Sequence, residues 1–192
     1  MTTHFRDKMS RAKVWYDFGY RPYHNLDHAK HVLKVCKLIC FGNISKELEY
    51  AAVFHDAVYI PGFFGNEEAS AQALINEYPY LDFIKTSAEL IRRTAITYHL
   101  SDTRLYGDIA VLLDADLSSL AADYATFKQN QINILNENGL DETPENLGKS
   151  SKFLVKIRYV REFIYHTDYG RANFEKSACE NIAKFYVDHN FS

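Results

Sequence analysis

Apolar residues recur at intervals of three and four along most of this chain, and this spacing is the feature that most limits its fold. Such spacing is typical of amphipathic helices, whereas the sustained alternation of apolar and polar residues that indicates strands does not occur. Glycine and proline residues interrupt the pattern and leave helix-length segments between them. We therefore predict an all-α fold, with helices near 4–18, 27–41, 46–58, 67–78, 83–99, 107–115, 121–138, 149–165 and 171–189.

The length of 192 residues suits one domain with a substantial hydrophobic core. We predict a single domain over 1–192, with its metal-binding core at about 20–120 and an additional C-terminal helical hairpin at about 121–190. A formal net charge of -3 argues against a protein that binds nucleic-acid polymers, because such proteins usually carry a basic excess. The segment Met1–Asp7 is polar, and no apolar run reaches membrane-spanning length, so we expect a cytoplasmic protein without a membrane segment.

Histidine and aspartate occur on the apolar faces of several predicted helices. On the helix at 27–41, His28 shares the face of the apolar residues, whereas His31 lies nearer its edge. The apolar stripe of the helix at 46–58 leads to His55, which Asp56 follows directly. Adjacent side chains of this kind can reach one ion that sits beside the C-terminal end of the helix. They supply one neutral and one anionic ligand.

A further carboxylate lies near the end of the helix at 107–115. Asp116 fits the apolar stripe of this helix better than Asp114 does. On the helix at 83–99, His99 extends the apolar stripe in the same way. One histidine on an apolar face is usually a core residue, but several such groups together would be costly to bury without an ion. We predict a centre that binds a divalent transition metal. Mixed histidine and carboxylate ligands suit Mn, Fe, Co, Ni or Zn better than calcium.

Several segments of the sequence also carry a family resemblance. They read RPYHNLDH at 21–28, FHDAVY at 54–59, NEEASA at 66–71 and LDADL at 113–117, with further similar stretches at 164–167 and 171–173. In these segments the chain resembles the HD superfamily of metal-dependent phosphohydrolases, and within it the small predicted HD phosphohydrolases. The resemblance implies an HD-type helical bundle whose metal is held by the four residues that the helical faces select: His28, His55, Asp56 and Asp116.

Two departures from the family pattern affect the expected chemistry. Many members that bind a single metal have a glutamate shortly after the His-Asp pair, where this chain has the segment 57–60, AVYI. The catalytic acid or base must then come from elsewhere. Glu67 and Glu68 are the nearest candidates, although acids in the first turn of a helix are equally common for other reasons. Members that bind two metals have further histidines before the last aspartate, and here only His99 lies in that interval, so we favour one metal.

We predict a metal-dependent phosphohydrolase that uses a metal-activated water to cleave a phosphate ester or anhydride. The substrate would be a nucleotide or another small phosphorylated molecule. We assign catalytic roles to Asp56, Glu67 and His99, the last as a partner of the metal ligands or as a donor to the substrate phosphate. We expect a second set of side chains to bind the substrate, because guanidinium groups pair well with phosphate. This set comprises Arg21, His24 and Arg93.

Three other functions remain open from the sequence. Some proteins with the HD fold hold two irons and activate dioxygen, and a second alternative is a non-catalytic module that binds a nucleotide. A third is a buried polar network with a purely structural role. The oligomeric state is also open, a homodimer being one alternative.

Overall fold

The computed structural model describes the backbone of residues 3–190 and the side chains of residues 8–190, so part of the polar segment Met1–Asp7 lies outside the described residues. Within the described residues the only regular elements are helices, which confirms the predicted all-α class. Their bounds are α1 Thr3–Tyr16, α2 Leu26–Ile39, α3 Lys46–Phe54, α4 Asn66–Glu77, α5 Ile84–Arg92, α6 Ile96–His99, α7 Asp108–Asp116, the 3-10 helix η1 Leu117–Ala121, α8 Tyr124–Glu137, α9 Pro144–Tyr159, α10 Asp168–Asn173 and α11 Glu175–Asn190.

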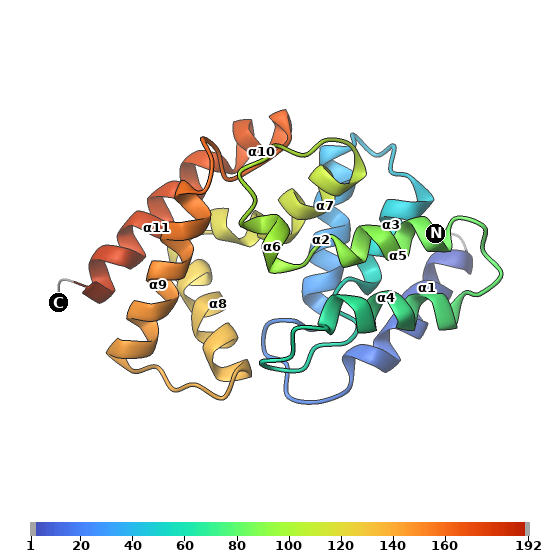
Figure 1. Cartoon of the computed structure of the whole chain (residues 1–192), viewed down its shortest axis with the longest axis horizontal. Coiled ribbons are helices and arrows are strands. Elements are labelled where there is room, and N and C mark those ends of the chain that lie inside the picture. The colour runs from blue at the N-terminus through green and yellow to red at the C-terminus, as the bar shows by residue number, and fades with distance from the viewer. Residues whose placement is uncertain (1–2, 191–192) are drawn as a thin grey trace.

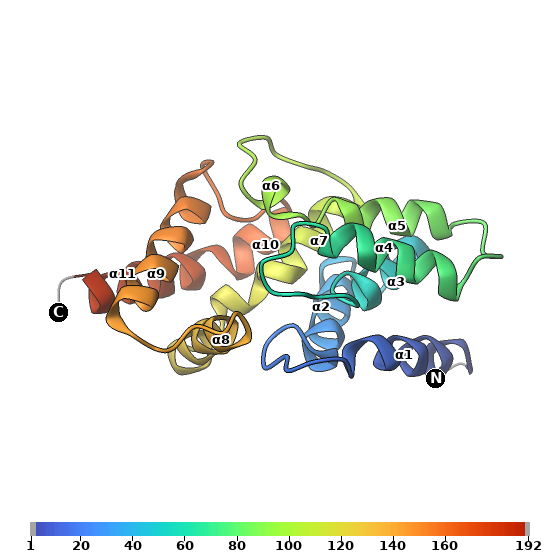
Figure 2. The same ribbon diagram turned by 60° about the horizontal axis from the view of Figure 1, so that its bottom comes forward.

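The helices pack around two hydrophobic clusters. The first is built mainly by α2, α3, α5 and α7, and the second by η1, α8, α9 and α11. Figures 1 and 2 show these groups at opposite ends of an elongated molecule, joined where α7 runs into η1. Phe174 packs against both clusters. None of the helices in the described part of the chain is long and apolar enough to cross a bilayer.

Two side chains set the beginnings of the helices that lead to the candidate site. Ser45 is the N-cap of α3, as its sequence position predicts, because its hydroxyl accepts a hydrogen bond from the backbone N–H of Leu48. For α2 the sequence predicts Asp27, because an aspartate just before an apolar helical segment is a typical N-cap. The N-cap is instead Asn25, whose side chain accepts hydrogen bonds from the N–H groups of Asp27 and His28. Asp27 lies in the first turn, where the helix dipole favours its charge.

The helix α3 ends earlier than predicted. The apolar spacing predicts a helix over 46–58 closed by Pro61, but the α-helix ends at Phe54, and His55 and Asp56 lie in the turn that follows. The N–H of Ala57 donates to the Phe54 carbonyl in this turn. Ser70 on α4 then holds both backbone polar groups of Val58, which stabilises the non-helical path. This turn is what positions the His-Asp pair.

The segment predicted as one helix over 83–99 is divided. α5 ends at Arg92 and α6 begins at Ile96, with Ala95 in an extended conformation between them. The Thr94 hydroxyl donates to the Ile91 carbonyl at the break, and such bonds compete with helix continuation. The break redirects the chain so that His99 reaches the candidate site. The predicted helix at 171–189 is likewise divided into α10 and α11, and that at 149–165 begins earlier, at Pro144.

Candidate metal centre

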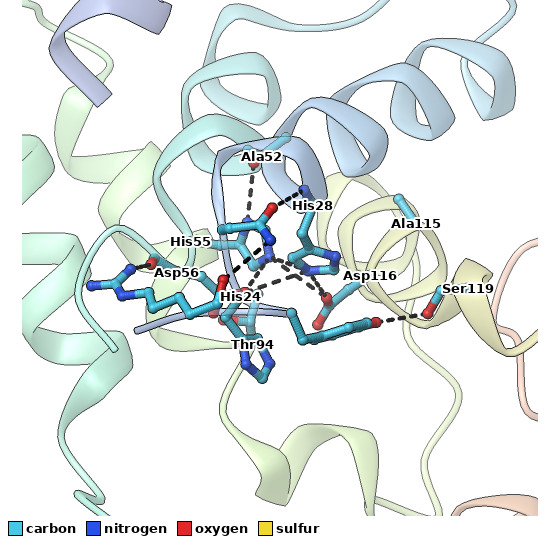
Figure 3. A network of polar contacts seen from close by, with 12 residues as sticks. His24, His28, Ala52, His55, Asp56, Thr94, Ala115, Asp116 and Ser119 are labelled. Atoms are coloured by element: carbon cyan, nitrogen blue, oxygen red, sulfur yellow. Dashed lines mark hydrogen bonds and ion pairs between the residues drawn. The ribbon is translucent and has the colours of Figure 1, made fainter. Parts of the chain in front are cut away.

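Four side chains from separate parts of the chain converge between the two halves of the molecule. They are His28 on α2, His55 and Asp56 after α3, and Asp116 at the end of α7, and their ligand atoms all lie within 4.8 Å of one another. Figure 3 shows the side chains pointing toward a common centre. These are the four metal ligands predicted from the sequence. The structure brings them together as a cluster that could hold a metal ion.

The distances within the cluster suit a shared ion. His55 Nε2 lies 3.0 Å from a carboxylate oxygen of Asp56. His28 Nε2 lies 3.1 Å from Asp116 Oδ1 and 3.3 Å from His55 Nε2. Two imidazole nitrogens and two carboxylates that face the same point make a donor set that first-row transition metals commonly accept.

The orientation of His55 is fixed by the backbone. Its Nδ1 lies 3.0 Å from the carbonyl oxygen of Ala52, which is in the last turn of α3. This nitrogen therefore carries the proton and donates a hydrogen bond to the carbonyl. The Nε2 atom therefore presents its lone pair to the cluster when the ring is neutral. A bond of this kind, from the second ring nitrogen to a carbonyl, is the usual support for a histidine that binds a metal.

The charges of the cluster favour a cation. Burial disfavours a charge on His28 and His55, but the nearby Asp116 and Asp56 outweigh it and raise both histidine pKa values. Burial likewise opposes ionisation of the two carboxyls, yet the histidines keep the pKa of Asp56 and the pKa of Asp116 well below the usual range. The negative charge of Asp56 and Asp116 keeps His28 and His55 protonated when no ion is bound. The same charge could hold a divalent ion in place of those protons, which would be released on binding.

The neighbouring aspartate Asp114 has a different role. Its side chain is more buried than that of Asp116, and it accepts hydrogen bonds from the N–H groups of His166 and Thr167 and from the Thr167 hydroxyl. It thus anchors the segment before α10. The sequence favoured Asp116 as the ligand, and only Asp116 belongs to the cluster, but the burial of Asp114 was not predicted.

A cavity of about 330 Å³ opens beside the cluster, between the two halves of the molecule. Asp56 and Asp116 line it on one side, together with two other residues that we predicted to be catalytic, Glu67 at the start of α4 and His99 on α6. His99 Nε2 lies 3.2 Å from Asp116 Oδ2. His99 thus lies beside Asp116 of the cluster, while Glu67 lies on the cavity wall.

His24, predicted to bind substrate, also lines this cavity. Its Nδ1 lies 2.5 Å from a carboxylate oxygen of Glu137, and its backbone N–H donates to the same carboxylate. The ring stacks on Tyr59, with the centroids 4.1 Å apart. Glu137 was missed by the sequence reasoning. It lies at the end of α8, 113 positions from His24, and the one available signal was an acid on the apolar face of a helix.

The two predicted substrate arginines lie elsewhere. Arg21 donates to the backbone carbonyls of Asp56 and Ala57, so it stabilises the turn that carries the His-Asp pair. The Arg93 guanidinium lies over the ring of Tyr98. Neither residue is among the side chains that line the cavity.

A larger groove of about 660 Å³ lies on the outer face of α2. Its lining is apolar with lysines at the edge, and it includes no member of the His/Asp cluster. We place the candidate site in the smaller cavity, because Asp56 and Asp116 of the cluster line it.

Comparison of the chain with models of protein families, with curated proteins and with solved structures finds no match. The family resemblance of the sequence therefore stays a prediction.

Proposed function

We propose that the protein is a metal-dependent phosphohydrolase of the HD type that cleaves a small phosphorylated molecule in the cavity beside the cluster. The observation that carries this proposal is the convergence of His28, His55, Asp56 and Asp116 next to an open cavity. A site of this donor set with room for a substrate is typical of metal-assisted hydrolysis. The resemblance of the sequence to HD phosphohydrolases supports the same reaction.

A divalent ion held by these four residues would supply Lewis acidity, which lowers the pKa of water and polarises a phosphoryl oxygen. Hydrolysis then forms a bond between the water oxygen and phosphorus and breaks the bond between phosphorus and the departing oxygen, which takes up a proton. We assign Asp56 to the orientation or deprotonation of the water, since it both joins the cluster and lines the cavity.

The remaining polar side chains of the cavity have supporting roles. His99 holds Asp116 in place through its Nε2. His24 is held rigidly by Glu137 and Tyr59 and presents its ring to the substrate. Glu67 lies on the wall as the nearest acid outside the cluster and stays a candidate for proton transfer.

The test is phosphate release by the metal-reconstituted protein across a panel of nucleotides and simple phosphate esters. We expect turnover that depends on the added metal and that is abolished in His55→Ala and Asp56→Ala, with the fold retained. His31→Ala is the matched control, because His31 is a neighbouring histidine that bonds to Ser118 outside the cluster. Turnover that persists in the two ligand variants would refute the proposal.

A further inference from the structure

The wall of the cavity opposite the cluster is apolar. It is formed by the helices α8 and α9, which contribute Ile134, Phe153, Leu154 and Ile157. The polar side chains on this wall are Gln131 and Ser150, whose hydroxyl lies 3.4 Å from the Gln131 amide oxygen. This wall can therefore contact an uncharged organic group and offer it neutral hydrogen-bonding partners.

The cavity also has few positive charges. Among the described residues that line the cavity there is no lysine or arginine. The lining does include three acidic residues, Asp56, Asp116 and Glu67. The His24 ring is already paired with the buried carboxylate of Glu137. The charge of a divalent ion would be balanced by the two carboxylates that bind it. One phosphoryl group could still coordinate the ion directly, but the described part of the cavity lining offers no lysine or arginine to neutralise a second anionic group away from the ion.

The size of the cavity adds a limit. Its volume of about 330 Å³ lies at the lower end of the range that small-molecule sites occupy. A bound molecule must fit its phosphoryl group beside the cluster and its remaining part between α8 and α9.

We propose that the site selects a substrate with one phosphoryl group on an uncharged, mainly apolar organic group that binds against α8 and α9, and that it discriminates against a second anionic group. This inference rests on the proposed function for the phosphoryl end and names the substrate class. It makes Ile134 and Phe153 determinants of specificity, while the cluster determines the chemistry.

The test compares two ligands of equal size that differ in charge at the far end, 4-carbamoylbenzylphosphonate and 4-carboxybenzylphosphonate. Both carry a P–C bond in place of the ester and cannot be hydrolysed, so their Kd values for the metal-loaded protein are measured by calorimetry without turnover. We expect the carboxamide to bind at least about tenfold more tightly than the carboxylate.

Three variants locate the discrimination. Ile134→Lys and Phe153→Lys each add one positive charge to the wall, and Phe153 is 39% exposed, so a lysine there is readily accommodated. Asn133→Lys adds the same charge to α8 at a position that does not line the cavity. We expect the first two to reduce the preference for the carboxamide severalfold and Asn133→Lys to leave it unchanged.

The results separate this inference from the proposed function. Equal or tighter binding of the carboxylate, absence of binding by either ligand, or equal effects of Phe153→Lys and Asn133→Lys would overturn the inference. Failure to hydrolyse any phosphate ester while the carboxamide preference holds would refute the hydrolase alone and leave the ligand class standing.

Discussion

At the residue scale, the faces of the predicted helices sufficed to choose His28, His55 and Asp116 as members of the cluster, and Asp56 was chosen as the neighbour of His55. His28 and Asp116 could be selected because each shares a face with apolar residues, and the structure places both in the cluster. The tight bond between His24 and Glu137 could not be predicted, because it joins positions far apart in the sequence and depends on how α8 docks. The anchoring role of Asp114 was hidden for the same reason.

The two aspartates of the LDADL segment should respond oppositely to substitution. Removing a residue that only hydrogen-bonds a metal ligand usually lowers metal affinity about 10–100-fold. Asp116→Asn removes a proposed ligand itself, so we expect it to lower metal affinity by at least as much. Asp114→Asn should keep the metal but lower the free energy of unfolding by about 1–3 kcal/mol, because three buried donors lose part of their acceptor. Metal titration and chemical denaturation of both variants check this. The prediction would be contradicted if Asp114→Asn lost the metal while Asp116→Asn kept it.

His166 should make stability depend on pH. Its Nδ1 accepts a hydrogen bond from the Leu105 N–H, and burial, with Arg161 nearby, lowers the pKa of His166 from 6.5 to about 3. As the pH falls through this interval the unfolded chain takes up the proton first, so the free energy of unfolding decreases. Below about pH 6.5, the melting temperature should therefore fall less steeply with decreasing pH in His166→Asn than in the wild type. The asparagine retains a hydrogen-bond acceptor but has no group that titrates. Parallel curves for the two proteins would refute this role.

At the scale of elements, periodicity predicted where helices lie but not where they are interrupted. The pattern of apolar residues continues through the breaks after Phe54 and Arg92, although only some residues there, such as Ala57 and Thr94, are buried. What interrupts the helices are contacts with other elements and local side-chain bonds, such as those of Ser70 and Thr94. Both breaks serve the site, because one positions His55 and the other His99.

The close approach of α10 to α7 can be tested with glycine substitutions. A Cβ at Gly170 would lie 2.5 Å from Asp114 Oδ2 and 2.8 Å from Tyr165 Cβ, and Asp114 is held by its own hydrogen bonds. Gly170→Ala should therefore lower the free energy of unfolding by about 1–3 kcal/mol. Gly148→Ala on α9 is the control, since its Cβ would lie at an ordinary contact distance of 3.4 Å from the His189 carbonyl oxygen on α11 and should be neutral or stabilising by up to about 1 kcal/mol. Equal effects of the two changes would disprove the tight approach.

At the scale of the whole molecule, the two hydrophobic clusters meet where the cavity lies. The first half supplies the four members of the His/Asp cluster, and the helices α8 and α9 supply the opposite wall and Glu137. Length and periodicity indicated a core with added C-terminal helices, but not that these helices complete the cavity. The C-terminal half is therefore part of the site as well as of the fold.

Glu137 gives the most direct test of this arrangement. Glu137→Gln preserves the shape of the side chain but replaces one acceptor of the bonds to His24 with a donor. We expect kcat/KM to fall at least about tenfold with the metal content unchanged, because the orientation of His24 is lost. Glu142→Gln, at an exposed position nearby, serves as the control. Full activity in Glu137→Gln would show that the C-terminal half does not contribute to the reaction.

The central claim is that His28, His55, Asp56 and Asp116 form a site for one divalent transition metal. Elemental analysis of the reconstituted protein, after removal of loosely bound ions, tests it most directly. The predicted result is one metal per chain in the wild type and in His31→Ala, and none in His55→Ala. Two irons per chain would instead favour the oxygenase alternative, and a wild-type protein that retains no metal while folding stably would reduce the cluster to a structural network.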